Sequence, residues 1–202
     1  MKTAFARASL AAFLTAPFLG SAALAEPAEF QFDKTHTVIK ASWDHGGYST
    51  MPMYFTDYDG VLLLDLEEPS NSTVDVTFNL ADGFWVGPNQ ERFIGHLNTA
   101  DFFNIEEFPT ARFVATSFET EDGETGTMTG DLTLLGETRP VSLDVKLNKA
   151  AENRWGTYVA GFDASGTLTR ADWGMDYATG GTTDDITIEI STELQMVTDE
   201  AE

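Results

Sequence analysis

The stretch 130–147, GDLTLLGETRPVSLDVKL, decides the fold class. Every second residue is apolar at 132–134 and again at 141–147. Such alternation turns one face of each run toward a core and the other toward water, which is typical of antiparallel strands. The polar break at 136–140 contains a glycine, so we expect a hairpin loop of three to five residues between two strands.

Thr138 and Arg139 lie in this break, and no general base or nucleophile stands beside them in the sequence. Catalysis by these two side chains is therefore disfavoured. We interpret them as hydrogen-bond partners that fasten the hairpin to a neighbouring loop. Pro140 cannot donate a ladder hydrogen bond and is expected to mark the start of the second strand.

The same period of two runs through most of the chain. Strands are expected at 29–34, 37–45, 60–67, 74–80, 113–118, 157–169 and 186–196, in addition to the hairpin. Clusters of glycine, asparagine, aspartate and proline separate them. The sequence thus predicts an all-β domain of about eight strands. A single sheet of that size must protect its edges, and closure into a barrel does so.

One segment, 89–104, departs from this period. Phe93, Leu97 and Ala100 are spaced as on one face of a helix. Asn98 or Thr99 could cap a second short turn. We therefore expect one or two short helices here, and we interpret the segment as a lid or end-plug for the barrel.

The N-terminal segment 1–25 is predicted to be a Sec signal peptide cut after Ala25, leaving a single domain at 26–202. Lys2 and Arg7 form a basic start, and the apolar stretch that follows is too short and too broken to span a membrane. The chain has no cysteine, which excludes both a lipid-anchored lipoprotein and disulfides. Export to the periplasm is the expectation.

The formal net charge of −22 restricts the partners. Nucleic acid and anionic membrane surfaces would repel such a chain. The charge serves solubility on one interpretation and a docking face for a basic partner on another.

Enzymatic signatures are weak. His36, His45 and His96 form neither HxH nor HExxH, so no metal site is predicted. A G-x-S-x-G elbow and glycine-rich phosphate loops are absent, and the DYDG sequence at 57–60 lacks the ligand spacing of a calcium loop. We predict neither catalytic residues nor a cofactor.

Four stretches carry a resemblance to a known family. They are FQFDKTHTVIKASWDHGGYST at 30–50, HLNTADFFNIEEFPTARFVAT at 96–116, the hairpin 130–147, and LTRADWGM at 168–175. In this order they resemble the successive motifs of the YceI-like family, and the resemblance spans essentially all of 26–202. Two departures stand out: Asn98 replaces a usual arginine, and TMPMY at 50–54 replaces V-x-G-x-F.

The resemblance implies a lipocalin-like, antiparallel eight-stranded β-barrel that is often dimeric and periplasmic. It implies a long apolar ligand inside the barrel, such as a polyisoprenoid, an isoprenoid quinone or a fatty-acid amide. We therefore expect a lipid-binding carrier. The alternatives are a quinone-binding partner of a membrane electron-transfer protein, and a ligand-free acidic interaction module.

The candidate ligand-binding residues are apolar side chains on predicted inward faces, together with polar groups near the helical segment. They are Trp43, His45, Phe78, Arg92, Phe93, His96, Leu97, Phe102, Phe113, Leu132, Leu134, Phe162 and Trp173. Arg92 and His96 are one helical turn apart and could orient a head group. Outside this set, His36 is expected to bond a backbone group at a corner, and Arg170 to pair with Asp172.

Overall fold

A computed structural model describes residues 26–81, 83–88, 90–179 and 184–198. The predicted signal segment 1–25 lies outside the described residues. The described elements are eleven strands, one α-helix and two short 3₁₀ helices. In chain order they are β1 (Ala28–Phe32), β2 (Val38–Asp44), β3 (Thr50–Phe55), β4 (Tyr58–Leu64), η1 (Pro69–Asn71), β5 (Thr73–Asn79), β6 (Phe84–Trp85), α1 (Gln90–Leu97), β7 (Thr110–Thr120), β8 (Thr125–Leu134), β9 (Glu137–Glu152), β10 (Tyr158–Thr169), η2 (Arg170–Trp173) and β11 (Asp185–Met196).

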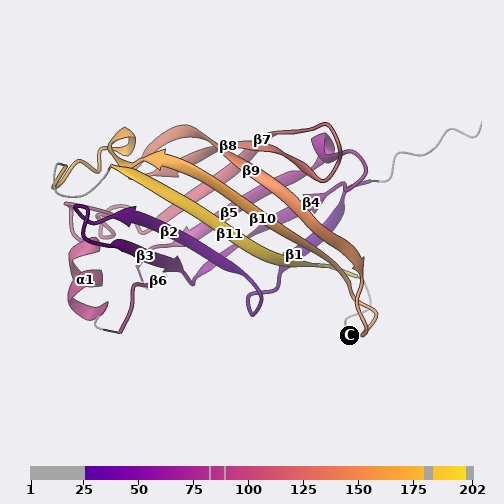
Figure 1. Ribbon diagram of the computed structural model, residues 1–202, viewed down its shortest axis with the longest axis horizontal. Coiled ribbons are helices and arrows are strands. Elements are labelled where there is room, and N and C mark those ends of the chain that lie inside the picture. Colours follow the sequence, from indigo (N-terminus) through magenta and orange to yellow (C-terminus); the bar gives the residue numbers. More distant parts are fainter. Residues whose placement is uncertain (1–25, 82, 89, 180–183, 199–202) are drawn as a thin grey trace, which may run out of the picture.

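Eight strands close into a ring, which confirms the predicted antiparallel barrel (Figure 1). The order around the ring is β1-β4-β5-β7-β8-β9-β10-β11, and β11 pairs again with β1. The remaining strands, β2, β3 and β6, extend the sheet from β11. Each of the eight strands of the ring therefore pairs with a neighbouring strand on both sides.

β1 and β2 pair with successive parts of the same strand, β11, and the two ends of the barrel differ. β11 pairs with β1 through residues 194–196 and with β2 through residues 187–191. At one end, which we call the hairpin end after the β7–β8 hairpin, η1 and the β7–β8 turn lie beside the closed ring (Figure 1). The name does not refer to the hairpin 130–147, whose loop lies at the opposite end beside η2. At the other, the α1 end, α1, η2 and the β2–β3 turn come together.

The hairpin 130–147 is present, but its loop is shorter than predicted. Leu134 pairs with Glu137, so only Leu135 and Gly136 form the loop. Both have positive φ, 52° and 77°. That conformation matches the twist of antiparallel strands, which is why a two-residue loop suffices. Pro140 lies within β9, opposite Asp131, instead of at its start.

Of the two polar residues of the hairpin, Arg139 makes the expected contact with a neighbouring segment, whereas Thr138 bonds within the hairpin itself. Arg139 Nε donates to the carbonyl of Asp172 in η2, at 3.3 Å. The hydroxyls of Thr138 and Thr133 lie 2.8 Å apart across the hairpin. The corner therefore joins the hairpin to a neighbouring segment.

Two strands were not predicted. β3 contains Pro52 and two methionines, which obscure the alternation, and β6 has only two residues. The helical segment contains the single helix α1, and turns follow it through residue 107. Thr99 does not cap a second helix; its hydroxyl donates to the carbonyl of His96 and closes α1.

Two clusters of buried side chains fill the barrel wall. One gathers around Leu80, Phe103 and Trp173 toward the α1 end, and the other around Leu62 and Leu194. In the part of the chain that the structure describes, no helix is long and apolar enough to cross a membrane.

Candidate ligand-binding cavity

A cavity of about 690 Å³ runs through the barrel. Its walls are the inward faces of the strands, where the period of two places apolar side chains such as Ala41, Phe78 and Ile188. Its lining extends from Tyr177 at the α1 end to Phe118 at the hairpin end. The volume lies within the range of roughly 300–1,000 Å³ that is common for small-molecule sites.

The structure brings eleven of the thirteen candidate residues together around this cavity. They are Trp43, His45, Phe78, Phe93, His96, Leu97, Phe102, Phe113, Leu132, Leu134 and Phe162. They come from β2, β5, β7, β8, β10 and α1 with the turn after it, and His45 directly follows β2. Most were chosen on alternation or helical spacing, which identifies a side chain's face before its neighbours are known.

Two candidates lie elsewhere. Trp173 is 3% exposed, and its indole Nε1 donates to the carbonyl of Leu132 at 3.1 Å. It is a core residue that fastens η2 to β8, because η2 turns its ring toward the wall. Arg92 is exposed on α1 and does not line the cavity, since the helix turns Phe93, His96 and Leu97 inward instead.

Three rings meet at the α1 end. The His96 ring lies 4.9 Å from the Phe102 ring and 5.4 Å from the Tyr177 ring, both edge-on. Phe102 and Tyr177 are 5.5 Å apart. All three line the cavity, and they come from α1, the turn after it and the segment after η2. Sequence reasoning missed Tyr177, because no periodic pattern marks the segment after η2.

Arg170 is buried beside these rings, with 4% of its surface exposed, and it lines the cavity. Its Nη1 donates to the carbonyl of Met175 at 3.0 Å, and its Nη2 to that of Tyr177 at 2.8 Å. Its ion-pair partner is Asp184, at 3.3 Å. The predicted pair with Asp172 is wrong, because the two residues lie in a tight 3₁₀ helix and not on one face of a strand.

Carboxylates surround the hairpin end. Asp65, Glu119 and Glu124 line the cavity there, and an adjoining hollow of about 650 Å³ adds Glu121 and Asp122. The amides of Thr125 and Glu124 donate to Asp122 and lower the pKa of that carboxyl from 3.8 to about 2. A hydrogen bond from Asn71, followed by one from the Glu68 amide, lowers the pKa of Asp65. Both carboxyls are therefore ionised near neutral pH.

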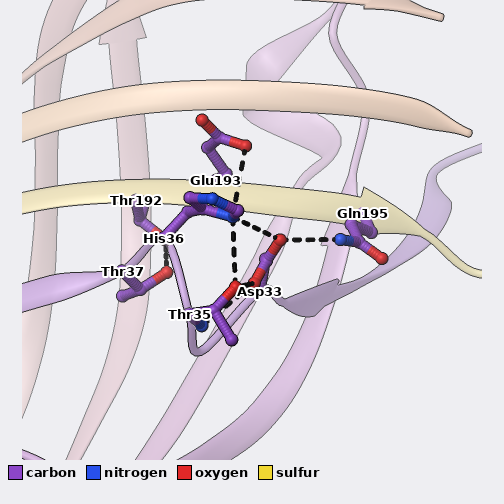
Figure 2. Close-up of polar contacts among 7 residues, drawn as sticks. All are labelled: Asp33, Thr35, His36, Thr37, Thr192, Glu193 and Gln195. Carbon is purple, nitrogen blue, oxygen red and sulfur yellow. Dashed lines mark hydrogen bonds and ion pairs between the residues drawn. The ribbon is translucent and has the colours of Figure 1, made fainter. Parts of the chain in front are cut away.

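A separate polar cluster lies where β1 gives way to β2 (Figure 2). Asp33, His36 and Glu193 place ligand-type atoms within 4.8 Å of one another. Asp33 accepts hydrogen bonds from the His36 ring and the Gln195 amide, both at 2.8 Å, and from the Thr35 hydroxyl and amide. These donors already occupy the carboxylate, so the cluster fastens the turn to β11 without needing an ion.

The same contacts shift the titration of the cluster. Hydrogen bonds from Thr35 and His36 hold the pKa of Asp33 well below its ordinary value. The hydrogen bond and charge of Asp33 raise the pKa of His36. The histidine was expected to bond a backbone group; its ring bonds a carboxylate instead, because the turn brings residues 33 and 36 together.

Comparison with known proteins places these observations in a family. Residues 30–194 match the YceI-like domain. The chain is 37% identical over 177 residues to a UPF0312 protein from Pectobacterium atrosepticum, which covers 87% of this chain and 90% of that relative.

Two solved structures share the fold. BcnA from Burkholderia cenocepacia has a TM-score of 0.71 at 17% identity, covering 80% of this chain and 98% of BcnA. A polyisoprenoid binding domain from Saccharophagus degradans, implicated in plant cell wall breakdown, has a TM-score of 0.61 at 8% identity. That match covers 84% of this chain and 99% of the domain.

Proposed function

This chain belongs to the YceI-like family, and we propose that it binds a long apolar lipid of the isoprenoid type inside its barrel. The cavity of about 690 Å³, apolar along its length and polar only at its ends, is the observation that carries the proposal. A slender hydrocarbon chain fits such a space better than a compact polar metabolite, which would leave its hydrogen-bonding groups without partners.

The energetics favour a chain-like ligand. Each buried methylene contributes roughly 0.8 kcal/mol, so a five-carbon isoprene unit contributes about 3–4 kcal/mol before ordering costs. Several units would suffice for tight binding without a charged contact. Selectivity along the tail would be loose, because one methylene separates ligands by only about 1–3 kcal/mol.

The polyisoprenoid binding domain from Saccharophagus degradans supports the same ligand class through its shared fold. Binding, and not catalysis, is the activity that we infer. With the predicted signal peptide, the function becomes that of a periplasmic carrier. An isoprenoid quinone as the ligand would instead make the protein a partner of a membrane electron-transfer protein.

Extraction tests the proposal. The full chain is expressed in a bacterial host, purified, extracted with organic solvent and analysed by mass spectrometry. We expect an isoprenoid lipid in near-stoichiometric amount, and redox-dependent ultraviolet absorption would identify a quinone. An empty extract, together with failure to take up added polyprenol, would show that the barrel carries no lipid.

Two variants of β10 test where the lipid binds, one inside the barrel and one on its outer face as the control. Ala164 lines the cavity, whereas Ser165, the next residue, is exposed on the outside of the barrel. Ala164→Phe should fill the middle of the cavity and remove the extracted lipid. Ser165→Phe adds a similar ring to the outer face and should retain it.

A further inference from the structure

The polar residues of the cavity are sorted by charge between its ends. Among the described residues that line it, the basic side chains are His45, His96 and Arg170, all at the α1 end. The acidic ones are Asp65, Glu119 and Glu124, all at the hairpin end. An amphiphile lying along the barrel would therefore meet nitrogen-bearing side chains at one end and carboxylates at the other.

Arg170 is the most deeply placed of the basic groups. A guanidinium has five N–H donors in a planar fork. Its described contacts are the carbonyls of Met175 and Tyr177 and the carboxylate of Asp184. These contacts fix its orientation at the cavity wall, so a ligand would meet a positioned donor and not a mobile surface side chain.

The ring cluster adds further polar atoms beside Arg170. His96 and Tyr177 both line the cavity and contact each other edge-on. An imidazole nitrogen and a phenol hydroxyl can each hydrogen-bond an oxygen atom. At the hairpin end, the ionised Asp65 already accepts hydrogen bonds from Asn71 and from the amides of Glu67 and Glu68. Among the described residues that line this end there is no Lys, Arg or His, so it repels an anion and offers it no cationic donor.

We propose that the ligand lies in one orientation, with an oxygen-bearing, hydrogen-bond-accepting head group at the α1 end against Arg170 and its tail toward the hairpin end. This inference rests on the proposed lipid-binding function. It assigns Arg170 as a residue that determines head-group specificity. The shared chemistry is a carboxylate, phosphate or carbonyl oxygen, and a cationic head group is excluded.

Bromine quenching of tryptophan emission tests the orientation. Trp43 lines the cavity at the α1 end, with its ring 6.0 Å from that of Phe93. We expect stearate brominated near its carboxylate to quench Trp43 more strongly than stearate brominated near its methyl end. Trp43→Phe should abolish the difference. Equal quenching, or stronger quenching by the terminal bromine, would overturn the proposed orientation.

Head-group preference is tested with palmitate, palmitamide, hexadecyl phosphate and hexadecylamine. A charge-assisted hydrogen bond is worth about 1.5–3 kcal/mol, so palmitate should bind about 10- to 100-fold more tightly than the amine. Arg170→Met should reduce this ratio at least several-fold. Arg112→Met, which removes an exposed arginine from the outer face of β7, should leave it unchanged.

The outcomes separate this inference from the proposed function. If Arg170→Met does not fold, Arg170→Lys combined with Tyr177→Phe replaces it, because the charge is kept while the planar fork and the phenol are lost. Tight binding of all four probes without preference would overturn the head-group assignment and leave lipid binding intact. Binding of none of them, together with failure to bind added polyprenol, would overturn the proposed function itself.

Discussion

The hairpin end and the α1 end of the barrel enclose one apolar cavity but are built by different means. At the hairpin end, the closed ring carries turns in which carboxylates accept hydrogen bonds from backbone amides, as Asp122 does. At the α1 end, β2, β3 and β6 extend the sheet, and Arg170 fixes the chain by donating to carbonyls. The strands thus supply a common wall, and the two ends supply different polar groups.

The largest effect on stability should come from substitutions in the strand wall, which we expect to matter equally toward both ends. Leu62 and Leu80 are the largest fully buried side chains among the described residues, and they belong to different clusters. Leu62→Ala and Leu80→Ala should each lower the free energy of unfolding by about 2–5 kcal/mol. Urea denaturation measures both, with Val61→Ala, at an exposed position on β4, as the control. Separate unfolding transitions for the two ends would contradict a single cooperative wall.

Substitutions of two glycines, one in the wall and one in α1, should change stability in opposite directions. A β-carbon at Gly130 would lie 2.3 Å from the Phe113 ring and 2.7 Å from the carbonyl of Val114. Gly130→Ala should therefore destabilise the protein by about 1–3 kcal/mol through overpacking, and push Phe113 into the cavity. Gly95 on α1 has no atom within 4 Å of the same position, so Gly95→Ala should stabilise by about 0.5–1 kcal/mol. Thermal unfolding compares the two variants, and equal signs would contradict this account.

Acid should loosen the hairpin end first. The lowered pKa of Asp122 means that its contribution to stability is complete above about pH 4 and is lost as the pH falls through about 2. The contacts of Arg170 to carbonyls do not titrate there. We expect the Glu124 and Thr125 amides to lose hydrogen-exchange protection between pH 4 and pH 2. The Gly174 amide, which donates to the carbonyl of Ala171 in η2, should keep it. Asp122→Asn should lack this dependence, and earlier loosening at Gly174 would reverse the prediction.

The smallest effect on stability is expected for the turn that holds Asp33 and His36. Because Asp33 raises the pKa of His36, the stabilisation from this pair is complete below pH 6.5, the ordinary value of histidine. It is lost as the pH rises through the raised value. Melting temperatures from pH 5.5 to 8.5 should therefore fall slightly more for the wild type than for His36→Gln. Parallel curves would mean that the pair contributes nothing measurable.

Much of the wall could be predicted from the sequence. The alternation at 74–80 and 186–196 identifies the inward side chains, because successive residues of a strand point to opposite faces. That rule placed Phe78 and Phe113 in the cavity without knowledge of their neighbours. It failed for Trp173, which lies in a 3₁₀ helix where the period of two does not apply. β3 escaped prediction because Pro52 and the methionines around it hide the period.

The sequence by itself determined most of the strands, their inward faces, the acidic charge and the family. Tertiary structure alone decided that the ring closes around a void, since the space left depends on strand pairing and on side-chain conformations. It also decided which charges meet. His45, His96 and Arg170 are far apart in the chain, and so are Asp65 and Glu119. Only the pairing of the strands brings the first set to one end of the cavity and the second to the other, because local periodicity fixes a residue's face but not its distant neighbours.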